Sequence, residues 1–383
     1  MMKANFTNLL TDYSRKKFQL FPPDNNFSGL DGVHVQLDSN LIGLLDDMVI
    51  ASGQKMDMQF LPSADLYHLQ RKFIEFDQRM NSVSNSKLQL DVKSMTNSMS
   101  FKLHTRNGPI FIHFLYGSKL HIAPILHAIH TFSYMFPYNY SMLSIYICLD
   151  NNKRNIDDKT SDPFTYMHQT SQAFNVGGVT RRYDKEIILS RTEEIIKLLY
   201  HEMVHFIGLD SCLINIQQGN WNLAISTELN FSEAYTEFLA IVLNAAYQSI
   251  HLAWLKNTSI YQMYHSLLNI ETQYSLYLVS NILRFYGYSK DDYQNFFYNI
   301  GEKNFSPIAT WEYVVLRTQL LLNMNHVGAI TRNWQTNRQN CYQIISLMKI
   351  DKNLINDLSF FFKQTATTPN ISYTMVDLDW TRI

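Results

Sequence analysis

The chain has little charge and no clear excess of either sign. Lys and Arg number 32 and Asp and Glu number 33 among 383 residues, which gives a formal net charge of −1. Proteins that bind nucleic acids carry an excess of basic side chains that neutralises phosphates. The composition therefore predicts no nucleic-acid partner.

Cysteine is scarce too. The three cysteines, Cys148, Cys212 and Cys341, are widely spaced and odd in number. Small disulfide-held proteins carry an even and dense set of cysteines, and cysteine zinc sites carry C-x-x-C pairs. We therefore expect three packed thiols in a reducing compartment.

Long apolar runs are missing as well. The amino-terminal segment has no run of signal-peptide length, and the longest apolar stretch, residues 238–246, is interrupted by Asn244. A membrane-spanning helix needs about 20 apolar residues, so we expect a soluble protein with no membrane partner. A composition rich in Asn, Tyr and Phe suits a large-virus protein or a bacterial effector, so we place the protein in the cytoplasm or inside a host cell.

The hydrophobic periodicity gives the order helix, sheet, helices. Apolar residues recur every three or four positions over 66–80, which is typical of a helix. The period changes to two on both sides of a predicted hairpin turn at Asn107–Gly108, and again over 143–149. Two short strands, over 173–180 and 186–189, lead into the helical remainder.

Strands followed by helices indicate an α+β fold. We expect a helical or mixed region over 1–95, a core with a mixed sheet over 96–250, and a mainly helical carboxy-terminal lobe over 251–383. The sequence gives no indication of the oligomeric state.

Residues 201–205 read HEMVH and match H-E-x-x-H. On a helix, His201 and His205 lie one turn apart on one face, so both imidazoles can reach one metal ion. Glu202 lies beside that face, where its carboxylate can take a proton from a metal-bound water. Without a metal, the same pattern is two histidines on a core helix.

The neighbouring residues favour a well-formed helix around this motif. Ser190 and Glu193 have the spacing of a capping box, which predicts that the helix starts there. Gly208 fits the position that ends a helix.

A catalytic zinc site needs a third protein ligand and an open position for water. We expect Ser232 to cap a second helix, with Glu233 in its first turn and Glu237 one turn later. Glu233 is the favoured third ligand, and Glu228 is the alternative. Glu237 is placed to accept the free ring N–H of a ligating histidine. If no metal is bound, the two carboxylates belong to a solvated helix face.

The pattern over residues 173–250 resembles the gluzincins, the thermolysin-like group of zinc peptidases. It rests on the motif residues and the two later carboxylates, which are His201, Glu202, His205, Glu233 and Glu237. The resemblance implies a zincin-like catalytic core that contains the motif helix. It also implies that an edge strand before this helix, here residues 175–180, aligns a peptide or protein substrate.

The resemblance further implies a zinc metallopeptidase, a hydrolase that acts on peptide bonds. One Zn²⁺ would be bound by His201, His205 and Glu233, Glu202 would be the general base, and Glu237 would orient a histidine. The alternative function is a non-enzymatic structural or interaction protein that retains the fold. A third possibility is a plain helical protein with a chance motif.

Three questions stay open at the level of the sequence. The residue that stabilises the transition state has three candidates, Tyr298, His265 and His326. Metzincins extend the motif to a third histidine, but Ser211 occupies that position here, and Asp210 is one residue out of register. The substrate and the cleavage specificity are not readable.

Overall fold

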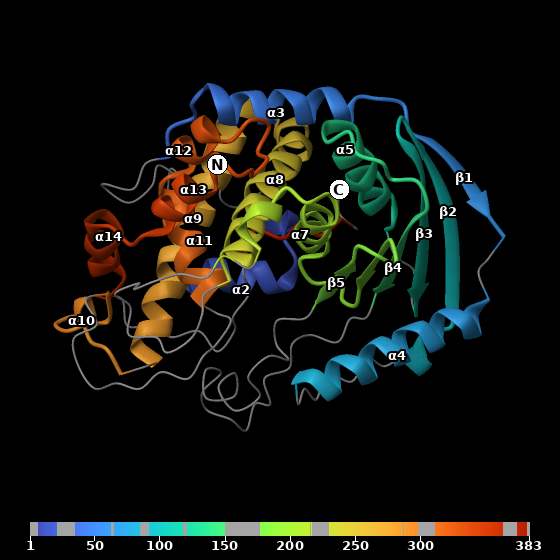
Figure 1. Ribbon diagram of the computed structural model, residues 1–383, viewed down its shortest axis with the longest axis horizontal. Helices are drawn as coiled ribbons and strands as arrows, with labels where there is room; N and C mark the ends of the chain where they lie inside the picture. The colour runs from blue at the N-terminus through green and yellow to red at the C-terminus, as the bar shows by residue number, and fades with distance from the viewer. Residues whose placement is uncertain are drawn as a thin grey trace. The chain divides into compact units, whose positions relative to one another are not determined.

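The computed structural model describes residues 7–20, 35–62, 65–84, 92–117, 121–149, 177–214, 216, 230–285, 287–297, 311–362 and 374–380 (Figure 1). These residues form two compact units. The helical unit contains Gly208–Asp379 and the described residues up to Ile42. The sheet unit contains the described residues from Gly43 to Ile207 and Trp380. The division into three consecutive regions stays a prediction.

The sheet unit is built on a six-stranded mixed sheet with the strand order β1-β2-β3-β4-β6-β5. The pairs β3–β4 and β4–β6 are parallel, and the other pairs are antiparallel. Figure 1 shows the sheet with its helices. The strands are β1 Asp57–Leu61, β2 Asn97–Thr105, β3 Gly108–Tyr116, β4 Leu143–Leu149, β5 Gly178–Arg181 and β6 Glu186–Leu189.

The three strands predicted from alternation are confirmed as β2, β3 and β4, with one shift at the hairpin. The turn between β2 and β3 is at residues 106–107, one position earlier than predicted, because Thr105 pairs with Gly108. Gly108 has φ +114°, and a Cβ there would lie 2.8 Å from the backbone nitrogen of Ser141. Both facts require glycine at this position.

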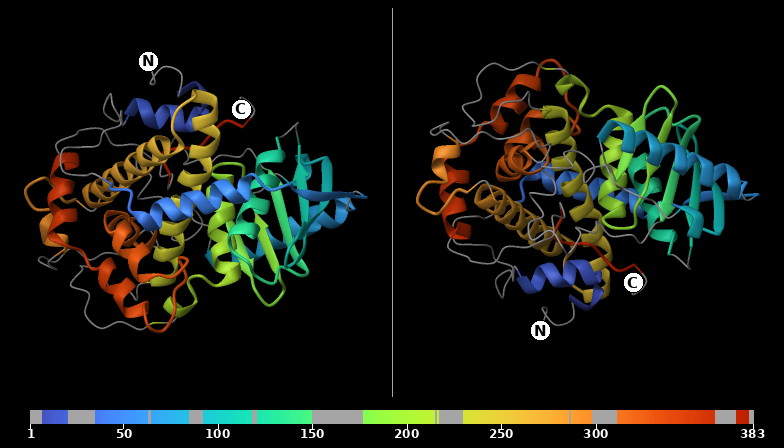
Figure 2. Two further views of the ribbon diagram at one scale, coloured as in Figure 1. Left: turned by 90° about the horizontal axis from the view of Figure 1, so that it is seen from above. Right: turned by 90° about the horizontal axis from the view of Figure 1, so that it is seen from below.

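The two faces of the sheet carry different helices. Leu69, Phe73 and Phe76 of α4 (Leu66–Ser84) pack against Leu115 of β3 and Ile188 of β6. In the view from below, α4 lies over the sheet (Figure 2). Successive strand residues point to opposite faces, so the intervening apolar residues of these strands point to the other face. Helices α5 (Ala123–Met135) and α7 (Ile195–Ile207) contact each other and the strands from that side. The sheet unit further contains helix α3 (Ser39–Ser52) for most of its length and the short 3₁₀ helix η2 (Val92–Ser94).

The helical unit is centred on two long helices that pack against each other, α8 (Phe231–Lys256) and α9 (Ile260–Phe285). Asn257 ends α8 in the left-handed conformation, with φ +49°. The other elements are η1 Thr7–Leu9, α2 Asp12–Leu20, η3 Ser211–Leu213, α10 Gln294–Phe297, the π-helix η4 Trp311–Leu316, α11 Arg317–Leu322, α12 Met324–Ile330, α13 Cys341–Met348 and α14 Lys352–Phe362.

Helix α8 is buried in spite of its length. It is the one helix in the described part of the chain that could cross a membrane by length and composition, and 78% of its most apolar window is buried inside the protein. Core helices of globular proteins commonly have this character. The mixed sheet and the mainly helical remainder confirm the predicted α+β class.

The segment 374–379 is held within the helical unit. The Glu271 carboxylate accepts hydrogen bonds from the backbone nitrogens of Met375 and Val376, both at 2.9 Å. Leu378 forms an isolated antiparallel bridge with Leu10. This bridge is the strand-like pairing that the described residues of the segment make.

Candidate metal centre

Helix α7 carries the H-E-x-x-H motif, and it starts later than predicted. The predicted capping box at Ser190 and Glu193 is wrong, because α7 begins at Ile195. The first helical carbonyl is that of Glu194, which accepts from the Leu198 backbone N–H at 2.8 Å. The hydroxyl and the backbone N–H of Ser190 both donate to the Gly177 carbonyl, at 3.1 and 2.8 Å. Ser190, which was predicted to cap the helix, therefore pairs with the segment before β5 instead.

The end of α7 is where the sequence placed it. The helix stops at Ile207, and Gly208 adopts φ +77°. Left-handed glycine is the usual end of a helix. The motif therefore occupies the last two turns of α7.

The two motif histidines lie together. The ring centroids of His201 and His205 are 4.8 Å apart, and the rings are inclined at 79°. His201 is buried, and His205 is partly exposed. The predicted one-turn spacing is confirmed by this geometry.

Helix α8 begins at Phe231 with Glu233 in its first turn, as predicted, but with another cap. The Asn230 side chain accepts from the Glu233 backbone N–H at 3.3 Å. The predicted capping role of Ser232 is wrong, because its hydroxyl donates to the carboxylate of Asp210. Asp210 is fully buried, and a buried carboxylate needs hydrogen-bond donors.

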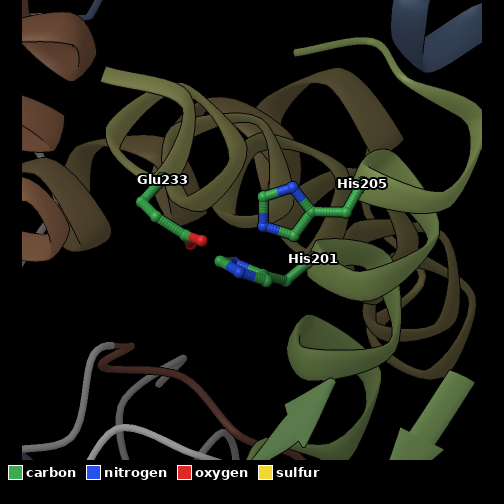
Figure 3. A group of neighbouring side chains, drawn as sticks. All are labelled: His201, His205 and Glu233. Carbon is green, nitrogen blue, oxygen red and sulfur yellow. The ribbon is translucent and has the colours of Figure 1, made fainter. Parts of the chain in front are cut away.

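His201, His205 and Glu233 form one group. Each offers one ligand atom, and these atoms all lie within 4.8 Å of one another. Figure 3 shows the three side chains turned toward one another. Ligand atoms about 2.1 Å from a tetrahedral zinc ion lie roughly 3.4 Å apart, which is within the 4.8 Å that contains the ligand atoms of this group. Two imidazoles and one carboxylate are a donor set that occurs in catalytic zinc sites, and the group could hold a metal ion.

The described alternatives to Glu233 as third ligand are not part of this group. Glu228 lies outside the described residues. The Asp210 carboxylate accepts from Ser232, and Ser211 opens the short helix η3. The third member of the group is Glu233. The same three residues are the ligands that the gluzincin resemblance implies.

Strand β5 encloses the carboxylate of Glu202. The Thr180 hydroxyl lies 2.8 Å from Glu202 Oε2 and 2.8 Å from the Glu202 carbonyl oxygen. A Cβ at Gly178 would lie 2.8 Å from Glu202 Oε1. Residues 178 and 180 face the same side of the strand, so that side of β5 fits the carboxylate closely.

The predicted strand before the motif is confirmed as β5, at one end of the strand order. Residues 175–176 lie outside the described part. The contact of Thr180 with Glu202 was not predicted from the sequence. The period-two alternation that places residues 178 and 180 on one side was the available signal.

Glu237 has a partner that the sequence did not suggest. Its Oε1 lies 3.3 Å from Nη1 of Arg317, and Nη2 of Arg317 donates to the Ser275 hydroxyl at 3.1 Å. Both charged side chains are almost fully buried. The ion pair joins α8 to α11. The contact between Glu237 and a histidine stays a prediction.

The three candidates for transition-state stabilisation have different settings. Nε2 of His265 lies 2.7 Å from the Val35 carbonyl oxygen, within the helical unit. His326 is exposed on α12. Tyr298 lies outside the described residues. The role stays without an assigned residue.

The chain has a relative in a giant virus. It is 42% identical over 356 residues to the uncharacterized protein R210 of Acanthamoeba polyphaga mimivirus, and the match covers 90% of this chain and 92% of the relative. No protein-family model matches the chain. No solved structure matches it either. The chain therefore belongs to the same family as the mimivirus protein R210.

Proposed function

We propose that the protein is a zinc-dependent peptidase with a zincin-like core of the gluzincin type. The observation that carries this proposal is the convergence of His201, His205 and Glu233 within 4.8 Å. Glu202 lies next to the first of these residues, on a helix that ends at Ile207. The H-E-x-x-H motif and the group of His201, His205 and Glu233 are the parts of a gluzincin-type site that the described residues contain.

A zinc ion bound by His201, His205 and Glu233 would polarise the scissile carbonyl and make its water ligand more acidic. Glu202 would be the general base that takes a proton from the attacking water and gives it to the leaving nitrogen. A residue in this role must be held in place but must not be a metal ligand. The contact of Glu202 with Thr180 supplies the first condition.

Strand β5 is suited to a substrate. It is the terminal strand in the order of the sheet, and extended peptides can add to such an edge through backbone hydrogen bonds. The side of β5 that carries Gly178 and Thr180 contacts the carboxylate of Glu202, the proposed general base. We therefore take a peptide or protein segment in extended form as the substrate.

Metal quantification on the purified protein tests the site. We expect one zinc per chain in the wild type and a loss of zinc in His205→Ala. The matched control is His68→Ala, because His68 is exposed on α4. Equal zinc content in all three proteins, or no zinc in any, would contradict the proposed centre.

Activity is tested next with a peptide library or a denatured proteome. Glu202→Gln should keep zinc but lower the rate by about a hundred- to ten-thousand-fold, because an amide cannot accept the water proton. The control is Glu75→Gln, since Glu75 is exposed on α4. Full zinc occupancy without any cleavage by the wild type would favour the non-enzymatic alternative, a structural or interaction protein that retains the fold.

A further inference from the structure

Two of the three cysteines are neighbours in the helical unit, although 129 positions separate them. The Cys341 thiol donates to the Cys212 carbonyl oxygen at 2.9 Å. The Cys212 thiol is also close enough to the Cys341 thiol to contribute to raising its pKa. Cys148 is fully buried in β4, in the sheet unit.

The backbone around the two thiols is held together at two further points. The Thr336 N–H donates to the Leu209 carbonyl at 2.8 Å. The Cys212 N–H donates to the Thr336 hydroxyl at 3.4 Å. Cys212 lies in η3 and Cys341 opens α13. These bonds hold the segments that carry the two thiols side by side.

The two thiols differ in accessibility. Cys212 is partly exposed, whereas Cys341 is 3% exposed. Burial, together with the neighbouring Cys212 thiol, raises the pKa of Cys341 to about 12. The thiolate is the reactive form. Cys212 therefore meets a dissolved oxidant first, and Cys341 reacts second.

We propose that Cys212 and Cys341 form a reversible disulfide with a small-molecule disulfide, such as oxidised glutathione, as the oxidant. The Cys212 thiolate attacks one sulfur of the oxidant, which forms a mixed disulfide and releases one glutathione thiolate. The deprotonated Cys341 thiol then attacks the Cys212 sulfur and releases the second glutathione. The protein loses two protons and two electrons, and the oxidant is reduced to two glutathione molecules.

The disulfide would act on the segment next to the candidate metal ligand. It links η3, which directly follows Asp210, to α13, and Asp210 accepts from Ser232 beside Glu233. The closed loop is long and contains α8, α9 and α11. A cross-link over such a loop stabilises the fold mainly by restricting the unfolded chain. The inference does not depend on the proposed peptidase function.

The test uses the full-length chain with and without Cys148→Ala, which leaves only the two neighbouring cysteines. Each protein is incubated with oxidised glutathione, its remaining thiols are alkylated, and its non-reduced peptides are mapped by mass spectrometry. We expect a peptide pair linked through Cys212 and Cys341, its loss after reduction with dithiothreitol, and a higher melting temperature of the oxidised chain.

Two variants in the Cys148→Ala background separate the steps. Cys341→Ser should stop at a mixed disulfide of Cys212 with glutathione, and Cys212→Ser should stay unmodified while folded. The rate at which Cys341 displaces glutathione from Cys212 should rise roughly tenfold for each unit by which the pH is raised, as long as the pH stays below the pKa of Cys341. The reason is that only the thiolate attacks. If either variant fails to fold, the peptide map of the wild type decides.

Three results would overturn the inference. The first is a mixed disulfide at Cys212 that persists although Cys341 is present. The second is a cross-link that involves Cys148 in place of one of the pair. The third is a folded chain whose thiols do not react with the oxidant.

Discussion

The general base of the proposed reaction is held by two small residues of one strand. Thr180 offers a hydroxyl 2.8 Å from the Glu202 carboxylate, and Gly178 leaves the space that the carboxylate occupies. A hydrogen bond to a charged group contributes about 1.5–3 kcal/mol. The orientation of Glu202 therefore depends on the hydroxyl at residue 180, and not only on the helix that carries the base.

We predict that Thr180→Val lowers kcat and leaves the zinc content unchanged. Valine has the shape of threonine but no donor, and the lost hydrogen bond corresponds to roughly a tenfold or larger loss in rate. Thr180→Ser keeps the hydroxyl and should retain most of the activity. Steady-state kinetics and metal analysis on both variants provide the check. Equal activity of the Val and Ser variants would show that the hydroxyl does not position Glu202.

At the level of whole helices, a buried ion pair links α8 to α11. Glu237 and Arg317 lie 3.3 Å apart, and Arg317 also donates to Ser275 of α9. Removing one partner of such a pair leaves an unpaired buried charge, whereas removing both avoids that cost. The pair thus fixes the part of α8 one turn after Glu233.

We predict that Arg317→Met destabilises the protein by about 3–5 kcal/mol, because Glu237 loses its buried counter-charge. The double variant Arg317→Met with Glu237→Gln should recover part of this loss. Urea denaturation of the wild type, both single variants and the double variant forms the cycle. Additive effects of the two single changes would indicate that the two side chains do not interact.

For the molecule as a whole, a metal ion bound at the proposed centre would be linked to stability. An ion held by residues of the folded chain stabilises it by mass action, since the unfolded chain does not bring those residues together. His201 and Glu233 come from different helices, α7 and α8. Zinc binding should therefore raise the free energy of unfolding.

We predict that a chelator lowers the melting temperature of the zinc-loaded wild type, and that added zinc restores it. His205→Ala should melt at the same temperature with and without the chelator. Thermal denaturation followed by circular dichroism gives the comparison. A wild type that is indifferent to the chelator despite its loss of zinc would contradict the linkage between metal and fold.

The sequence determined the features that depend on short-range periodicity. Alternation identified the strands that became β2, β3 and β4, and the four-residue spacing of His201 and His205 placed both rings on one face of α7. Gly208 ended that helix as expected. Each of these features is fixed by residues a few positions apart, so a single sequence is enough to read it.

The tertiary structure decided which local options the chain uses and which distant residues meet. Ser190 and Ser232 were both suited to cap helices, but strand pairing and the buried Asp210 engage them instead. Arg317 reaches Glu237 across 80 positions, and Cys341 reaches Cys212 across 129. Periodicity carries no information about such pairings, because they form only when packing brings separate helices together.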